Sequence, residues 1–209
     1  MKTIYHPEIH KITVIFLHGF NQSVSDVEYM TGLIHCDVIR WVILEGKNMR
    51  WYNYYTQRDN HNRHDKINYT QFTQSCEYLK KTIDYELGYT EPHNLYLTGT
   101  SQGGTVCINT AINLDVSLGG IICIDTIFLT DYMSDVSFVK QAFYVLISTK
   151  DKVYNPKFQN VCYDMLRFLG NDIYITKRTK EHTEDTSEIC NYINNILQKN
   201  KLLKNLIYK

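Results

Sequence analysis

The apolar residues of this chain follow two alternating patterns, and this alternation limits the fold more than any other feature of the sequence. Six short runs are rich in Val, Ile, Leu, Phe and Tyr. Nearly continuous runs of this kind are typical of strands that are covered on both faces, as in a parallel sheet. We expect strands at residues 11–17, 38–44, 94–98, 120–124, 143–148 and 172–176.

Between these runs, apolar residues recur every three or four positions, which is the period of one face of a helix. Five or more alternations of strand and helix predict an open, mostly parallel α/β sheet of six or seven strands with helices on both faces. No repeat or Pro/Gly/Ser-rich linker interrupts the pattern, so we expect residues 1–209 to form a single domain. The expected helices cover residues 72–87, 106–114, 158–169 and 189–206.

A short glycine-rich motif follows the strand expected at 94–98, because residues 99–104 read Gly-Thr-Ser-Gln-Gly-Gly. Gly-x-Ser-x-Gly between a strand and a helix is typical of a nucleophilic serine on a sharp turn. The serine then has a strained backbone and projects its hydroxyl above the sheet. The start of the next helix stabilises developing negative charge. We therefore predict that Ser101 is the catalytic nucleophile.

A second turn follows the strand expected at 11–17, where residues 18–22 read His-Gly-Phe-Asn-Gln. We expect the backbone N–H groups of Phe20 and Gln102 to form an oxyanion hole. Each such donor contributes on the order of 3–4 kcal/mol to a tetrahedral intermediate. We interpret His18 as a structural hydrogen-bonding residue rather than the catalytic base, because it precedes the strand that carries the serine.

The catalytic base of such a site follows the serine in the chain order Ser, acid, His. Downstream of Ser101 the sequence has one histidine, His182, between the expected strand 172–176 and the last helix. That loop lies at the carboxyl edge of the sheet, where active sites of open α/β folds gather. We predict that His182 is the base; the alternative is a surface-loop histidine, which would leave the serine without one.

Asp151 is the predicted acid, because it follows the strand 143–148 by a short turn. Beside the imidazole of His182 it would hold the tautomer and stabilise the imidazolium. Asp125, at the end of the preceding strand, remains an alternative. Asp172 is less suitable, because it opens its strand at the opposite end.

These motifs resemble the α/β-hydrolase superfamily and, within it, the phospholipase/carboxylesterase group, which includes acyl-protein thioesterases and small bacterial carboxylesterases. The resemblance covers residues 12–197 and implies an α/β-hydrolase fold. It also implies a cofactor-free serine hydrolase acting on carboxylic esters, lysophospholipids or acyl-thioesters. The matching residues are 16–20 (Phe-Leu-His-Gly-Phe), 48–53 (Asn-Met-Arg-Trp-Tyr-Asn), 99–104, 151–153 (Asp-Lys-Val) and His182.

The loops around the predicted site suggest how a substrate is held. Residues 125–142 are too few for a cap domain, so we expect an open site. The long segment 47–69 would form one wall. Trp51 and Tyr52, together with Tyr54 and Tyr55, are candidate substrate-binding residues that offer an apolar contact surface. The alternative is a loop that packs on the edge of the sheet.

Composition excludes several other classes of protein. The chain has 22 Lys and Arg against 22 Asp and Glu, so its charge gives no reason to expect nucleic acid as a partner. No apolar run is long enough for a membrane helix, and the first residues are too polar for a secretory signal. The six scattered cysteines fit buried free thiols, and we expect a cytoplasmic protein.

Two further segments have ordinary explanations. His61 and His64 precede Asp65 in a polar loop, which we interpret as solvated rather than as a metal site, so no metal is predicted. The C-terminal residues 199–209 mix lysines with leucines, and we expect a packed terminal helix rather than a membrane contact.

The sequence thus predicts a serine esterase or thioesterase whose partner is a small-molecule or lipid acyl substrate. Two alternatives stay open: a peptidase or amidase on the same fold, and a catalytically silent hydrolase scaffold that binds a ligand. The sequence does not determine the acyl length, the leaving group or the oligomeric state.

Overall fold

The computed structural model describes residues 2–4, 10–34, 38–54, 67–130 and 139–200 of the 209-residue chain. Seven strands form one sheet in the order β1-β3-β2-β4-β5-β6-β7. Six of them are parallel, and β1 at the edge runs antiparallel to β3. The strands are β1 (Lys2–Ile4), β2 (Ile12–Leu17), β3 (Ile39–Leu44), β4 (Leu95–Thr100), β5 (Gly120–Ile124), β6 (Ala142–Ser148) and β7 (Asp172–Arg178).

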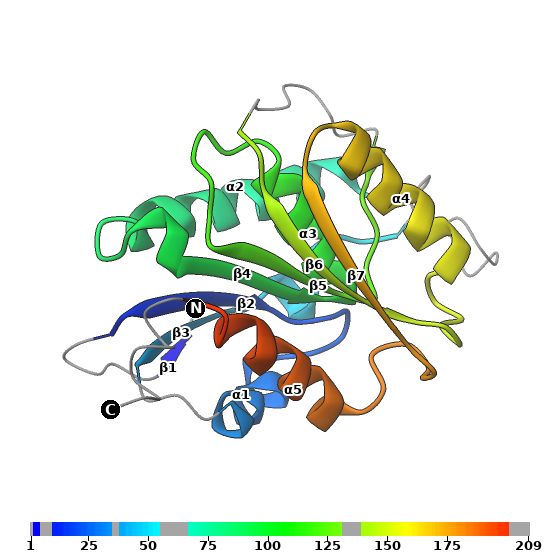
Figure 1. The fold of residues 1–209 in the computed structure, drawn as a ribbon, viewed down its shortest axis with the longest axis horizontal. Coiled ribbons are helices and arrows are strands. Elements are labelled where there is room, and N and C mark those ends of the chain that lie inside the picture. The colour runs from blue at the N-terminus through cyan, green and yellow to red at the C-terminus, as the bar shows by residue number, and fades with distance from the viewer. Residues whose placement is uncertain (1, 5–9, 35–37, 55–66, 131–138, 201–209) are drawn as a thin grey trace.

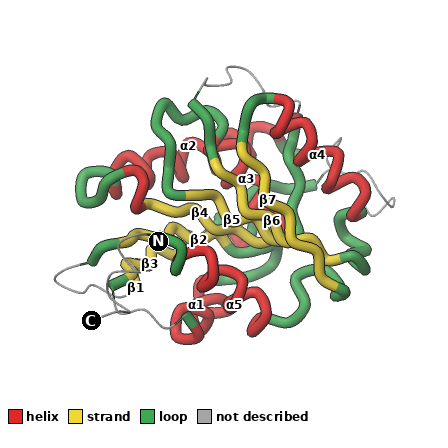
Figure 2. The backbone as a smooth tube through the Cα atoms, viewed as in Figure 1, coloured by secondary structure: helices red, strands yellow, loops and turns green. Residues whose placement is uncertain are grey.

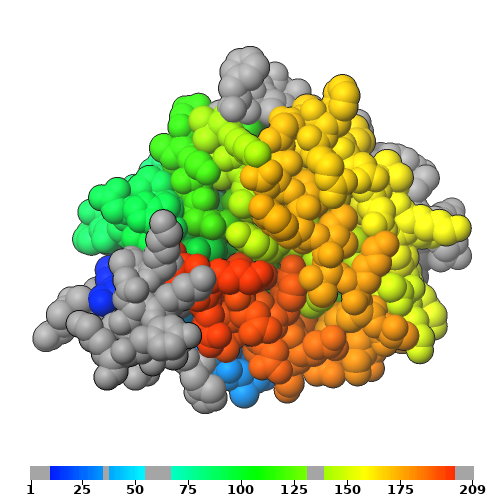
Figure 3. Space-filling model, viewed as in Figure 1, coloured from blue at the N-terminus to red at the C-terminus, as the bar shows by residue number. Residues whose placement is uncertain are grey.

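Helices cover both faces of this sheet, as Figures 1 and 2 show. One face packs against α2, α3 and α4 in the larger core, and the other packs against α1 and α5 in the smaller core. The space-filling view shows α5 and the α4–β7 region as adjoining areas of one surface (Figure 3). The helices are α1 (Val24–Leu33), α2 (Tyr69–Glu86), α3 (Ser101–Ala111), α4 (Pro156–Phe168) and α5 (Thr186–Leu197), with short 3₁₀ turns η1 (Lys47–Met49) and η3 (Pro92–Asn94).

The burial of the parallel strands explains why their apolar runs could be recognised in the sequence. All residues of β2, β3, β4 and β5 are buried, and most of their side chains are apolar. The exception with a charge is Arg40 of β3, which pairs with the buried Glu86 at 2.8 Å. All six predicted strands are confirmed, with ends that differ by at most two residues. The mostly parallel sheet with helices on both faces is confirmed as well.

Two elements were missed by the sequence analysis. Strand β1 has three residues, which is too short for a pattern. Helix α1 turns only Val24, Val27 and Met30 into the core, so its apolar stripe is thin. A local signal does mark its start, because the Asp26 carboxylate accepts hydrogen bonds from the N–H and the hydroxyl of Ser23, at 2.7 and 2.8 Å.

The last helix is shorter than predicted. Helix α5 ends at Leu197, where the N–H of Gln198 closes the final turn on Asn194 O. Residues 198–200 no longer continue the helix, so the prediction of one helix through this segment is wrong there. Leu203 and Leu206 lie outside the described residues.

Parallel pairing brings the turns that carry the predicted site to one edge of the sheet. Strands β2 and β4 are neighbours, with Leu17 paired to Gly99, so the turns after them lie side by side. Strands β6 and β7 are also neighbours, paired as far as Ser148 and Arg178. The described parts of the β5–β6 connection, residues 125–130 and 139–141, contain no α-helix. None of the described helices combines the length and apolar character needed to cross a bilayer.

Candidate active site

Ser101 lies where β4 ends and α3 begins, on the sharp turn expected from the motif. Its φ angle is 49°, in the left-handed region that residues with a side chain rarely adopt. Such a conformation costs on the order of 1–3 kcal/mol and persists where the surroundings enforce it. The residue is buried, with 8% of its surface exposed.

Three glycines make this turn possible by letting backbones approach one another. A Cβ on Gly99 would lie 2.5 Å from the N atom of Gly104, and one on Gly103 would lie 2.4 Å from His18 O. On Gly104 it would lie 2.8 Å from the Thr126 methyl carbon. The close contacts connect the serine turn to the turn after β2, so the glycines fix the spacing between the two halves of the site.

We expect Gly103→Ala to lower the free energy of unfolding by at least about 3 kcal/mol, because the added methyl group meets two carbonyl oxygens of rigid backbone. Urea unfolding followed by circular dichroism measures this. Gly32→Ala is the matched control, since a Cβ there meets nothing within 4 Å, and alanine favours the helix. A Gly103→Ala variant within 1 kcal/mol of the wild type would contradict the prediction.

His182 lies in the β7–α5 turn and connects the serine to a carboxylate. Its Nε2 atom is 2.8 Å from Ser101 Oγ, and its Nδ1 atom is 2.7 Å from Asp151 Oδ2. An ionised carboxylate only accepts hydrogen bonds, so Nδ1 carries the proton and Nε2 of the neutral ring accepts the Ser101 hydroxyl. The structure therefore brings together Ser101, Asp151 and His182, the three catalytic residues predicted from distant positions in the sequence.

The Asp151 carboxylate is buried and fully hydrogen-bonded. Its Oδ1 atom accepts the N–H groups of Val153 and Tyr154 at 2.7 and 2.9 Å. Its Oδ2 atom accepts Gln159 Nε2 at 3.1 Å in addition to His182 Nδ1. Four donors fix the position of both oxygens, so neither oxygen is left without a hydrogen bond in its buried position.

Asp125, the alternative acid, is not hydrogen-bonded to His182, although both residues belong to the described part of the chain. Its Oδ1 atom accepts Ser148 N at 2.6 Å. Its Oδ2 atom accepts Ser148 Oγ, Arg178 Nη2 and Thr183 N at 2.7, 3.2 and 2.7 Å. The geometry favours Asp151 as the partner of the imidazole. Asp172 lies at the far end of β7 and pairs with Lys140 there.

The predicted oxyanion-hole amides belong to two turns that meet at the serine. A Cβ on Gly19 would lie 3.6 Å from Ser101 Cβ, so the segment leading to Phe20 borders the nucleophile. Gln102 is in the first turn of α3, whose N–H groups have no partner within the helix. Its side chain is anchored from both ends, accepting from Trp51 N at 2.8 Å and donating to Tyr52 O at 2.7 Å.

His18 is a structural residue, in line with the sequence analysis. Its ring is buried, Nε2 accepts the Gly46 N–H at 3.0 Å, and Nδ1 donates to Gly19 O at 2.7 Å. Desolvation by burial lowers the pKa of His18 below its usual value, which keeps the ring neutral. The ring thus supports the turn that carries the Phe20 amide.

Trp51 and Tyr52 do not form the exposed apolar surface that was expected. They are 3% and 1% exposed. The indole N–H of Trp51 donates to His18 O at 2.8 Å, and the Tyr52 ring packs edge-on against Phe72 at 5.2 Å between centroids. These two residues therefore pack inside the protein, where their backbone and indole groups bind His18 and Gln102 of the two turns of the site. This is closer to the alternative interpretation, a loop packed on the sheet, than to an exposed contact surface. Tyr55 lies outside the described residues.

A different set of aromatic rings borders the site. The sequence analysis named Tyr54 as a candidate contact residue but gave no such role to the rings of Phe20 and Tyr154. Phe20 is 40% exposed, and its ring packs edge-on against the Tyr54 ring, with 6.1 Å between the ring centroids. The Tyr54 and Tyr154 hydroxyls are 2.8 Å apart, and the Tyr154 ring packs edge-on against His182 at 5.5 Å. We call Phe20, Tyr54 and Tyr154 the aromatic rim. No local motif signals it, because its members come from three separate loops.

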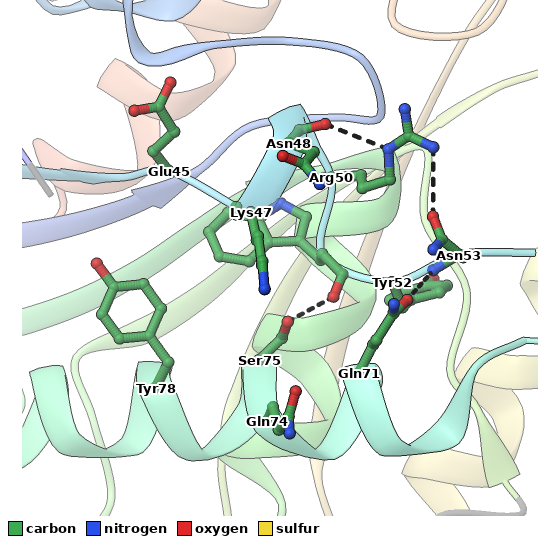
Figure 4. A pocket seen from close by; sticks show the side chains of 12 residues that line it. Glu45, Lys47, Asn48, Arg50, Tyr52, Asn53, Gln71, Gln74, Ser75 and Tyr78 are labelled. Carbon is green, nitrogen blue, oxygen red and sulfur yellow. Dashed lines mark hydrogen bonds between the residues drawn. The ribbon is translucent and has the colours of Figure 1, made fainter.

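A cavity of about 820 Å³ lies beside this site, between η1 and α2 (Figure 4). Figure 4 shows the Lys47 side chain extending from η1 toward Ser75 of α2. The lining includes Trp51 and Tyr52 but neither Ser101 nor His182. The cavity therefore does not open on the serine hydroxyl.

One cluster with metal-ligand spacing occurs in the described residues, formed by Asp125, Asp151 and His182. Its carboxylate oxygens already accept N–H and O–H donors, and the Arg178 guanidinium lies 3.2 Å from Asp125, so the donor set suits acid–base chemistry. The predicted polar loop with His61, His64 and Asp65 lies outside the described residues.

The prediction of buried free thiols is confirmed for the five cysteines in the part of the chain that the structure describes. Burial raises the pKa of Cys76 to about 12, and those of Cys162 and Cys190 to about 11. These thiols therefore stay protonated and are poor nucleophiles.

Comparison with known proteins identifies the family of the chain. A family model described as phospholipase/carboxylesterase matches residues 2–200. The chain belongs to the phospholipase/carboxylesterase family. This confirms the resemblance proposed from the motifs, and with it the α/β-hydrolase fold. A search of curated proteins by sequence found no significant match.

Solved structures of the same fold come from plants and bacteria. Arabidopsis thaliana SOBER1 superposes with a TM-score of 0.75 at 15% identity, over 90% of this chain and 98% of that one. Zea mays acyl-protein thioesterase 2 gives 0.67 at 13% identity, over 94% and 98%. The Bacillus cereus carboxylesterase gives 0.73 at 10% identity, over 95% and 92%. At these identities the likeness establishes the fold.

Proposed function

We propose that the chain is a serine hydrolase that cleaves carboxylic esters or acyl-thioesters through an acyl-enzyme on Ser101. The observation that carries this proposal is the hydrogen-bond chain from Asp151 through His182 to Ser101, at 2.7 and 2.8 Å. A histidine that accepts from a serine hydroxyl and donates to a buried carboxylate is the arrangement that activates a serine nucleophile. Membership of the phospholipase/carboxylesterase family supports the same reaction class.

In the first half of the reaction, Ser101 Oγ attacks the acyl carbonyl carbon while its proton moves to His182 Nε2. The imidazolium that forms is stabilised by Asp151, which already accepts the Nδ1 proton. The carbonyl oxygen gains negative charge, and the N–H groups of Phe20 and Gln102 would bind it. The bond to the leaving alcohol or thiol then breaks, and His182 returns its proton to that group.

In the second half, water replaces the leaving group. It attacks the acyl carbon of the Ser101 ester and gives a proton to His182 Nε2, so that the same two groups act again as base and acid. The tetrahedral intermediate collapses, the carboxylic acid leaves, and Ser101 recovers its proton. The cycle uses no oxidant, metal or cofactor.

The aromatic rim supports an acyl substrate with an apolar chain. Phe20 exposes part of its ring next to the proposed oxyanion hole, and the Arg50 guanidinium lies over that ring at 5.0 Å. An acyl chain on the serine would run past these rings and bury apolar area, at roughly 25 cal/mol per Å². The names of two structural neighbours, a thioesterase and a carboxylesterase, are compatible with such substrates.

Phe20→Ala should therefore change chain-length preference rather than chemistry, since the backbone amide of residue 20 is retained. We expect kcat/KM for p-nitrophenyl octanoate to fall about fivefold to tenfold, from the loss of apolar contact. For p-nitrophenyl acetate we expect a fall of about twofold at most. The exposed Tyr85→Ala on α2 is the control, and equal losses for the short and the long ester would contradict the rim as an acyl contact.

Turnover assays on the wild type test the proposal itself. The panel has p-nitrophenyl esters of increasing length, an acyl-thioester and a matched anilide. We expect ester or thioester hydrolysis and labelling by a fluorophosphonate. Hydrolysis of the anilide alone would indicate an amidase, and ligand binding without turnover would indicate a silent scaffold.

A further inference from the structure

The turn that carries His182 holds a strained residue next to the histidine. Thr183 has a φ angle of 51°, and a β-branched residue in this region is an outlier that its surroundings must enforce. The turn lies between β7 and α5 (Figure 1). Two residues later Asp185, with φ 63°, caps α5 by accepting Glu188 N. The left-handed backbone at Thr183 and Asp185 thus sets the path of the turn and, with it, the position of the His182 imidazole.

The contact that enforces this conformation comes from Asp125. The Thr183 N–H donates to Asp125 Oδ2 at 2.7 Å, across 58 positions of sequence. The same oxygen accepts the Ser148 hydroxyl at 2.7 Å and Arg178 Nη2 at 3.2 Å. The Asp125 side chain is completely buried, so a hydrogen bond to its charge is stronger than one between neutral groups.

Asp125 is itself rigidly held. Its φ angle is 46°, its N–H donates to Leu146 O at 2.9 Å, and its Oδ1 atom accepts Ser148 N at 2.6 Å. It follows β5, whereas Ser148 and Arg178 end β6 and β7. The carboxylate therefore joins three strand ends to the histidine turn, and it does so within 4.8 Å of the ligand atoms of Asp151 and His182.

We propose that Asp125 is a positioning residue: by accepting the Thr183 N–H it keeps that residue in its left-handed conformation and so holds the His182 ring between Asp151 and Ser101. The inference rests on the proposed function for its catalytic consequence. The positioning itself is a property of the fold and can be measured without turnover.

The kinetic test uses two substitutions in combination. Asp125→Ala should lower kcat for a p-nitrophenyl ester about 50-fold with KM within about threefold, because the ring leaves its working geometry for most of the time. Adding Thr183→Gly should then restore kcat at least about fivefold, since glycine adopts a positive φ without strain. If Asp125→Ala does not fold, Asp125→Asn replaces it, with a fall of about tenfold expected.

A matched control separates positioning from stability. Ser148→Ala removes the hydroxyl that binds both Asp125 Oδ2 and Arg178 Nε, but leaves the Thr183 contact in place. It should lower Tm while kcat stays within about twofold. A folded Asp125 variant with kcat within threefold of the wild type overturns the proposal. So does a loss of kcat that Thr183→Gly fails to restore.

A spectroscopic measurement keeps this proposal distinct from the proposed function. The His182 Nδ1 proton bonded to Asp151 gives a far-downfield proton resonance in the wild type, whether or not any ester is cleaved. We expect the resonance to broaden or vanish in Asp125→Ala and to return with Thr183→Gly. An unchanged resonance in Asp125→Ala overturns the positioning role. If the resonance changes and returns as expected but no variant, including the wild type, hydrolyses an ester, only the esterase activity is contradicted.

Discussion

Replacing Ser101 by alanine is expected to lower kcat for p-nitrophenyl esters by a factor on the order of 10⁵–10⁶. The reason is that no other group in the described site can form the acyl-enzyme, because His182 Nε2 would then face a methyl group in place of the hydroxyl at 2.8 Å. Residual turnover would come from the oxyanion-hole donors acting on bound ester and water. Intact-mass measurement after treatment with a fluorophosphonate should show one adduct on the wild type and none on Ser101→Ala.

Two checks make this result interpretable. Alanine is also strained at the φ angle of 49° that Ser101 adopts, so circular dichroism and Tm must show a folded variant. Ser117→Ala is the matched control, because Ser117 is exposed and hydrogen-bonds Lys140 O, ahead of the amino ends of β5 and β6. We expect it to be labelled and active. Wild-type protein that takes up no label, or Ser101→Ala that keeps its turnover, would contradict the nucleophile assignment.

The strands and helices could be predicted from the sequence where burial produces a clear hydrophobic pattern. Strands β2 to β5 are covered on both faces, so they read as continuous apolar runs. Helix α2 shows the same principle, with Phe72, Cys76, Leu79 and Ile83 on one buried stripe. Strand β1 and helix α1 left weak traces, because one is three residues long and the other turns three side chains inward. The assignment of residues 1–209 to one domain and the cytoplasmic location stay predictions.

The residues Ser101, Asp151 and His182 could be predicted for a different reason. The order of parallel strands places the ends of β4, β6 and β7 along one edge, and His182 is the one histidine downstream of Ser101. Contacts between side chains of different loops produce no comparable pattern in the sequence. No motif or spacing indicates that Tyr154 packs on His182 or that Asp125 accepts the Thr183 N–H. Trp51 was misjudged because an aromatic residue in a long polar segment resembles a contact surface, whereas its indole N–H is used inside the protein.

The second large effect is expected for Asp151→Asn, which should lower kcat by about 10⁴-fold with little change in KM. The contacts of Asp151 dictate how the amide would sit. Its Oδ1 position accepts two backbone N–H groups, at 2.7 and 2.9 Å, so the amide oxygen has to occupy it. The NH₂ group then takes the Oδ2 position, 2.7 Å from His182 Nδ1.

A donor at that position reverses the tautomer of the imidazole. With the NH₂ group donating to Nδ1, the ring proton moves to Nε2, which can then no longer accept the proton of Ser101. The far-downfield Nδ1 proton resonance should disappear while Tm falls only modestly, so chemistry and folding are separated. Asp164→Asn on the surface of α4, where Asp164 pairs with Arg167, is the control. If Asp151→Asn kept kcat within about tenfold, the imidazole would have to take its orientation from the other buried carboxylate nearby, Asp125, and the assignment of the acid would pass to that residue.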